Sequence, residues 1–216
     1  MRHVSLAFAA VALLAACDNA GPTSPSTPAA PPTDAAPLLG LFPPKDVPGT
    51  RAIALEATAL GLTVKAGEAG PLPMPEGGSE KNSALTAGLP NVLYTSVLNG
   101  EVWANRYHAR ASSSVDQLTL NLVGLKLTAS VLAANSHADC TGEALGGSSV
   151  AGLTINGKSI AITGLPNQTI PLLIGKIVIN EQLPWNNGIR VRALHVVVYG
   201  VADVVVAEAA SPRLTC

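Results

Sequence analysis

Apolar and polar residues alternate along three stretches in the middle of the chain. These stretches are Trp103–Ala111, Leu118–Leu122 and Leu125–Ala133. Because successive side chains of a β-strand point to opposite faces, this period of two predicts strands with one buried face. In the first stretch, Arg106, His108 and Arg110 share the polar face, which we interpret as solvated.

Further apolar runs, separated by turn-forming residues, extend this pattern toward both ends. The additional predicted strands are Ile53–Val64, Val150–Ile155, Ser159–Thr163, Gly175–Ile179, Ile189–Tyr199 and Val204–Ala209. The predicted turns lie at Asn99-Gly100, Asn156-Gly157, Leu165–Gln168, Asn186–Gly188 and Gly200–Asp203. Asn-Gly between two short apolar runs favours a tight hairpin, and the proline-rich segment Gly70–Gly78 is expected to be a loop. No stretch has a convincing helical repeat, although Leu55–Leu62 is ambiguous.

Many short strands joined by Gly, Asn and Pro turns are typical of an all-β domain. We therefore predict a single antiparallel β-sandwich-like domain. A β-solenoid is the alternative, because Gly61–Val64 and Gly152–Ile155 repeat a similar tetrapeptide. Two similar tetrapeptides do not make a repeat array, which needs at least three units.

The N-terminus has the pattern of a lipoprotein signal peptide. Arg2 precedes an apolar run, Val4–Leu14, which is shorter than the roughly 20 residues that span a bilayer. The run ends in Leu-Leu-Ala-Ala before Cys17, which resembles the lipobox of bacterial lipoproteins. The resemblance implies removal of residues 1–16 and attachment of a diacylglyceryl group and an amide-linked acyl chain to Cys17. An ordinary secretory signal with a chance cysteine is the alternative.

Residues 17–48 are predicted to form the lipidated cysteine and a flexible linker. Asp18–Pro37 consists almost wholly of Pro, Ala, Ser and Thr, which cannot bury enough apolar surface to offset the entropy of ordering. Its prolines favour an extended tether at about 3.1 Å per residue. The remaining residues, 49–216, are expected to form the all-β extracytoplasmic domain.

Composition limits the classes of partner that the protein is expected to bind. Charged residues make up 12% of the chain and the formal net charge is −1, with no basic stripe that would indicate nucleic-acid binding. If Cys17 carries lipid, Cys140 and Cys216 remain as a pair in an oxidising compartment, and we predict a disulfide between them. A metal site is the weaker alternative, because the pair lacks a CxxC spacing or nearby histidines. No metal and no cofactor are expected.

Four later features occur in a fixed order. They are an Ala-rich strand ending in Asp139-Cys140, the segment Gly152–Gly157, the segment Ile179–Gln182, and Ala193–Val196 followed by a closing Cys216. This set resembles the bacterial choice-of-anchor P family, over roughly residues 50–216. The resemblance implies a shared extracytoplasmic domain with varying anchors, and it implies no established activity.

No catalytic constellation stands out. No serine lies in a Gly-x-Ser-x-Gly motif, and the carboxylates Glu181 and Asp203 would meet only through the fold. His195, inside an apolar strand, is interpreted as a core histidine bonded to a backbone carbonyl. Asn180 and Gln182 are predicted to bond the backbone of the loop that follows them, with Glu181 exposed between them.

The expected function is therefore general. The leading interpretation is a lipid-anchored envelope protein that acts as a structural or interaction module, held at the outer membrane or cell surface. A ligand- or glycan-binding module is the alternative, with Trp185 as an exposed stacking platform and Glu181 beside it; core packing of Trp185 stays open. A hydrolase is the third hypothesis. Expected partners are the membrane, through the lipid on Cys17, and an envelope protein, extracellular protein or glycan.

Overall fold

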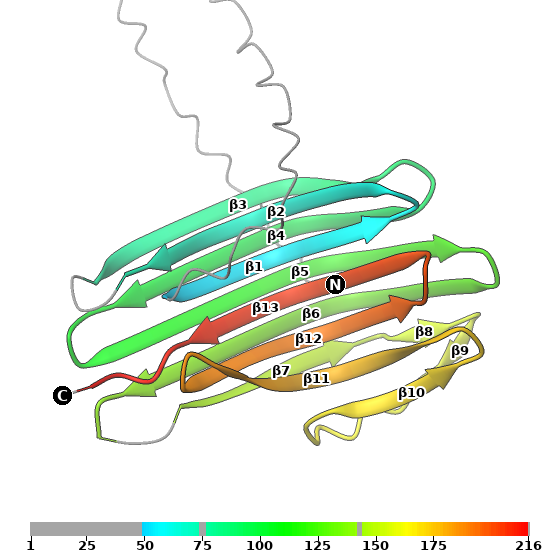
Figure 1. The fold of residues 1–216 in the computed structure, drawn as a ribbon. Helices are drawn as coiled ribbons and strands as arrows, with labels where there is room; N and C mark the ends of the chain where they lie inside the picture. Colours follow the sequence, from blue (N-terminus) through cyan, green and yellow to red (C-terminus); the bar gives the residue numbers. More distant parts are fainter. Residues whose placement is uncertain (1–48, 74–76, 142–143, 216) are drawn as a thin grey trace, which may run out of the picture. The chain divides into compact units, whose positions relative to one another are not determined.

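The computed structural model describes residues 49–73, 77–141 and 144–215, and Cys17 and Cys216 lie outside them. The described residues form thirteen strands (Figure 1). The strands are β1 (Thr50–Ala59), β2 (Leu62–Leu72), β3 (Gly78–Leu89), β4 (Leu93–Ala104), β5 (His108–Leu122), β6 (Leu125–Asp139), β7 (Leu145–Ala151), β8 (Thr154–Ile155), β9 (Lys158–Ser159), β10 (Gln168–Leu172), β11 (Gly175–Trp185), β12 (Gly188–Val198) and β13 (Ala202–Ser211). No helix in this part of the chain is long and apolar enough to cross a membrane.

The strands build two antiparallel sheets that pack face to face. The six-stranded sheet has the order β10-β11-β12-β13-β1-β2, and the seven-stranded sheet has the order β3-β4-β5-β6-β8-β9, with β7 also paired to β6. This confirms the predicted antiparallel sandwich and is inconsistent with the β-solenoid. The turn at Asn156-Gly157 is also confirmed, because Ile155 pairs with Lys158 across it.

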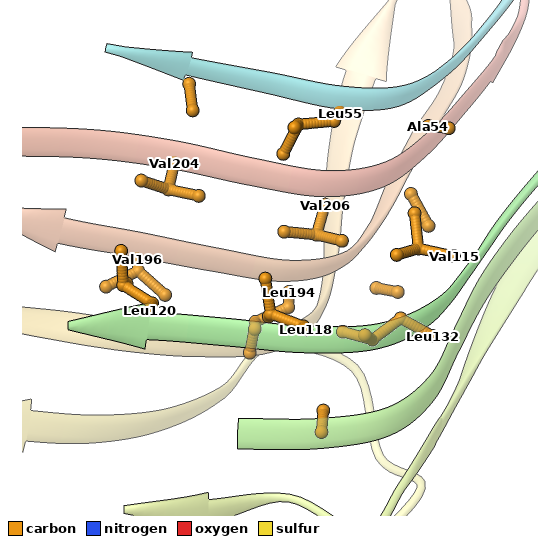
Figure 2. Close-up of a cluster of buried hydrophobic side chains, with 14 of the residues drawn as sticks. Ala54, Leu55, Val115, Leu118, Leu120, Leu132, Leu194, Val196, Val204 and Val206 are labelled. Atoms are coloured by element: carbon orange, nitrogen blue, oxygen red, sulfur yellow. The ribbon is translucent and has the colours of Figure 1, made fainter. Parts of the chain in front are cut away.

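Aliphatic side chains fill the space between the sheets. Leu55 and Val206 from the six-stranded sheet meet Leu118, Leu120 and Leu132 from the seven-stranded sheet, and none of the five is more than 1% exposed (Figure 2). Aliphatic side chains suit this position because they remove apolar surface from water and carry no polar group that would need a partner. The core therefore needs few aromatic residues, in agreement with their 3% share of the sequence.

The predicted strand Ile53–Val64 is wrong in one respect, because it is a hairpin. β1 and β2 are joined by a tight turn at Leu60 and Gly61, both of which have positive φ. β1 and β2 have similar composition, and Gly61 is the one turn-forming residue at their junction. The sequence pattern therefore does not show where the first strand ends. β2 also continues to Leu72, into the segment that was expected to be loop from Gly70.

Asn99-Gly100 does not form the predicted turn; it lies inside β4. A Cβ atom at Gly100 would stand 2.3 Å from the carbonyl oxygen of Gly67 in β2. This glycine is therefore required by a close approach between the two sheets rather than by a turn.

The stretch Trp103–Ala111 is likewise two strands. β4 ends at Ala104 and β5 begins at His108, and the Asn105 side chain caps the turn by accepting hydrogen bonds from the backbone N–H groups of Tyr107 and His108, each at 2.8 Å. Asparagine favours such turns. Arg106 consequently lies in the turn, and Trp103 lies on a different strand from His108.

The regular alternation of side chains between the two faces of the six-stranded sheet is interrupted at one register position. Gly67 in β2, Ala207 in β13 and Asn180 in β11 occupy equivalent register positions and have φ values of 62°, 55° and 52°. A left-handed residue lets two neighbouring side chains point to the same face. On β12, which lies between β11 and β13, Arg192 and His195 are three positions apart, and both contact the Glu181 carboxylate.

Candidate functional site

A shallow groove of about 720 Å³ crosses β4, β5 and β6 on the outer face of the seven-stranded sheet. We call it the ring groove. Its principal side chains come from three adjacent strands: Glu101, Trp103, His108, Arg110, Asn135 and His137. Figure 1 shows the course of β4, β5 and β6, which are neighbours in the seven-stranded sheet. The lining residues lie near the ends of β4 and β6 and near the start of β5.

The antiparallel register brings these side chains together in cross-strand rows. Trp103 pairs with Arg110, and Arg110 pairs with His137. One row further along, Glu101 pairs with Ser112, and Ser112 pairs with Asn135 on β6. Directly opposite residues share one face of a sheet with Cβ atoms about 5 Å apart, so each row is a continuous patch.

Three rings lie over these rows, with His108 between Trp103 and His137. The ring centroids of Trp103 and His108 are 6.4 Å apart with an interplanar angle of 21°. His108 and His137 are 6.5 Å apart at 20°. Trp103 is 40% exposed, so part of its ring is open to solvent. The three rings therefore present a nearly parallel set of aromatic surfaces along the groove.

The polar side chains of the ring groove have few partners in the protein. Among the residues that the structure describes, Arg110 forms no ion pair, and His108 and His137 make only ring contacts. Glu101 pairs with Lys81 at 3.0 Å, in an exposed ion pair. Free donors beside open ring surface are the usual features of a ligand site.

A second cluster, which we call the charge cluster, lies on the outer face of the six-stranded sheet and is shielded from solvent. The Glu208 carboxylate is 1% exposed and accepts hydrogen bonds from Arg51 Nη2 at 2.6 Å and Arg192 Nε at 2.8 Å. Arg190 Nε lies 3.7 Å away. Burial alone would raise the pKa of Glu208, but the three guanidinium charges outweigh burial and hold the pKa below its ordinary value of 4.5.

Glu181 belongs to this cluster and is not exposed as expected. Its carboxylate accepts a hydrogen bond from Arg192 Nη1 at 3.1 Å and lies 2.8 Å from His195 Nδ1. His195 Nε2 lies 3.0 Å from Asp203 Oδ1. Burial would raise the pKa of Glu181, but His195 and Arg192 lower it below 4.5. His195 therefore bridges two carboxylates instead of bonding a backbone carbonyl.

Trp185 is not an exposed platform. It is 5% exposed, its Nε1 donates to the carbonyl oxygen of Gly49 at 3.3 Å, and the guanidinium carbons of Arg190 and Arg51 lie 3.8 Å and 5.1 Å from a ring centroid. Both ring contacts are cation–π interactions. The Trp185 ring therefore packs against two arginines of the charge cluster and is not available to stack on a ligand.

Asn180 and Gln182 bond backbone groups, although not those of the following loop. Asn180 Nδ2 donates to the carbonyl oxygen of Gly164 at 3.3 Å. Gln182 Nε2 donates to the carbonyl oxygen of Gly146 at 3.2 Å. Asparagine also tolerates the positive φ at position 180 better than most residues.

Cys140 directly follows β6 and packs against a small cluster that contains Ala104, Ala109 and Leu214. Leu214 is two residues before Cys216 in the sequence. The pairing of the two cysteines stays a prediction, since Cys216 lies outside the described residues, as does Cys17.

Within the described ranges, no three His, Cys, Asp or Glu side chains are arranged to hold a metal ion. No protein-family model, curated protein or solved structure matches the chain. The function is therefore inferred from the two clusters. The charge cluster is buried and internally paired, whereas the ring groove is open and has unpaired donors, which makes the groove the candidate site.

Sequence reasoning missed Trp103 because the stretch around it reads as one strand, which places Trp103 and Ala109 on the same buried face. The turn signal was present in Asn105, which is a common turn residue. Dividing the stretch there puts Trp103 near the end of one strand and His108 at the start of the next.

Proposed function

We propose that the protein is a lipid-anchored binding module of the bacterial cell envelope and that the ring groove binds a glycan. The observation that carries this proposal is the partly exposed Trp103 ring aligned with His108 and His137 over unpaired polar side chains. The C–H face of a sugar packs on an aromatic ring, whose face carries partial negative charge. Neighbouring donors then bond the sugar hydroxyl groups.

The structural details of the groove suit a saccharide better than an apolar ligand. The rings stand among Arg110, Ser112 and Asn135, so apolar and hydrogen-bonding surface alternate over short distances. Sugars have the same alternation of C–H faces and hydroxyl groups. We assign no reaction to the groove.

Trp103→Ala is expected to weaken glycan binding about 30-fold, because loss of a central tryptophan anchor typically costs about 2 kcal/mol. Screening on a glycan array followed by calorimetric titration of the best ligand would measure the change. Tyr94→Ala is the matched control, since Tyr94 lies on the same strand and is 49% exposed but does not line the groove. Equal loss in both variants, or no loss in Trp103→Ala, would contradict the proposal.

The anchor is the second part of the proposed function, and it rests on the lipobox-like sequence before Cys17. Two or more acyl chains hold a protein stably on a membrane, whereas one holds it marginally. The proline-rich linker would then present the domain at a distance from the lipid. This arrangement suits a module that contacts envelope or extracellular glycans.

Cys17→Ser is expected to abolish fatty-acid labelling and to move the protein from the membrane fraction to the soluble fraction. The serine hydroxyl does not replace the thiol that receives the lipid. Detergent phase partitioning with metabolic labelling would measure both effects. A serine variant that stays labelled and in the detergent phase would exclude this anchor.

A further inference from the structure

We infer that the ring groove selects acidic glycans, in which a carboxylate on the stacked sugar is held by Arg110. This inference rests on the proposed glycan-binding function and names the ligand class. The ring groove combines a platform and a cation on adjacent strands, because Trp103 and Arg110 are direct cross-strand neighbours.

The spacing of these two residues fits a carboxylate carried by the sugar ring itself. Adjacent strands lie about 4.8 Å apart, so the Arg110 backbone is one strand spacing from that of Trp103. A sugar stacked on Trp103 would place a ring carboxylate within reach of the long Arg110 side chain. A guanidinium group offers two parallel N–H donors that match the two carboxylate oxygens.

Charge in the ring groove also favours an anion of low charge. Glu101 is paired with Lys81 at 3.0 Å, and Arg110 forms no ion pair among the described side chains. Two carboxylates, those of Glu101 and Asp139, nevertheless lie one row from Arg110 on the same face and disfavour a multiply charged group. A single carboxylate meets both conditions better than a phosphate dianion.

The groove is open toward β7, which suits a chain of sugars rather than a single one. Gly147 pairs with Asn135 and therefore lies on the same face as the groove. A Cβ atom there would meet nothing within 4 Å, so the position beside Asn135 carries no side chain and is unobstructed. The next β7 residue on this face, Leu145, lies opposite His137 and is exposed. An oligosaccharide can continue past Asn135 over this gap.

The test is an array of uronic-acid oligosaccharides, each printed beside the same oligosaccharide with its carboxyl groups reduced to alcohols, together with sulfated oligosaccharides. We expect the carboxylated members to bind roughly tenfold more tightly than their reduced partners, and added salt to narrow the difference. Arg110→Gln should lower affinity for the carboxylated members to that for the reduced ones. Arg110→Lys should recover part of the loss.

Lys126→Gln is the matched control, because it removes one exposed cation from β6 without touching the ring groove. Equal binding of carboxylated and reduced partners would overturn the acidic-glycan inference and leave glycan binding intact. Preference for sulfated members would overturn the choice of carboxylate. Absence of binding to every glycan would overturn the proposed function as well. Melting curves of the Arg110 variants would show that the fold is retained.

Discussion

Replacing Glu208 with alanine is expected to lower the free energy of unfolding by about 3–5 kcal/mol. Glu208 is 1% exposed and is surrounded by Arg51, Arg190 and Arg192. Its removal leaves three guanidinium groups close together without the carboxylate that offsets their repulsion. Breaking a buried ion pair from one side costs more than the pair itself contributes, because the remaining charges stay desolvated.

Chemical denaturation of the isolated domain at neutral pH measures this loss. Glu68→Ala is the matched control, since Glu68 also pairs with a cation, Lys65 at 2.6 Å, but both side chains are partly exposed. Exposed pairs typically contribute about 0–1 kcal/mol. A loss at Glu208 no larger than the loss at Glu68 would show that the cluster does not support the fold.

The same cluster predicts sensitivity to acid. The pKa values of Glu208 and Glu181 are held below the ordinary value of 4.5 in the folded protein. The stability that these carboxylates contribute is therefore complete above about pH 4.5, where the unfolded chain is also ionised. It is lost as pH falls below 4.5 through the folded pKa values. The Glu208→Gln variant should lose less stability than the wild type over that range.

Strand alternation predicted the middle of the fold well, for a physical reason. β5 and β6 each cross the sandwich with one face on the core, so Leu118 and Leu120 alternate with polar residues along β5, and the same holds at Leu127 on β6. A period of two is a direct consequence of this geometry. β6 was therefore recognised over most of its length, whereas β5 was predicted in two separate parts, the first of them joined to the end of β4.

Alternation failed where the backbone departs from regular strand geometry. The positive φ values at Ala207 and Asn180 change which face the following residues occupy, and nothing in a local pattern of alanines and valines marks the change. Asn99-Gly100 was predicted to be a turn because the dipeptide is typical of turns. The actual reason for the glycine, its close approach to Gly67, is a contact between strands of different sheets and is not visible in the local sequence. Such contacts depend on the packing of the two sheets.

The two side-chain clusters were least predictable because their residues meet only through the register. Glu208 and Arg51 are 157 positions apart and His195 and Glu181 are 14 apart, yet each pair shares one cluster. A lone charged residue in an apolar strand gives no indication of its partners. Trp185 illustrates the same difficulty, since its loop sequence favoured exposure whereas two arginines cover its ring.

The second large effect is expected from the cysteine pair. Cys140 directly follows the long strand β6 and packs near Leu214, in the segment that follows β13. A bond to Cys216 would close a loop of about 76 residues and fix the C-terminal segment to the end of the seven-stranded sheet. Leu214 beside Cys140 brings the two cysteines' chain segments to the same place and supports this pairing.

Loss of the bridge is expected to lower the free energy of unfolding by about 4–5 kcal/mol, from the chain entropy that a loop of this length restores to the unfolded state. Cys140→Ala, Cys216→Ala and the double variant should therefore lose nearly the same amount, because either change alone already opens the loop. Chemical denaturation of the three variants, and of the wild type with and without reductant, measures it. Non-reducing peptide mapping of protein taken from the envelope should recover the two cysteines in one linked peptide. Free thiols at both positions, or additive losses in the double variant, would exclude the disulfide and leave each cysteine with an independent role.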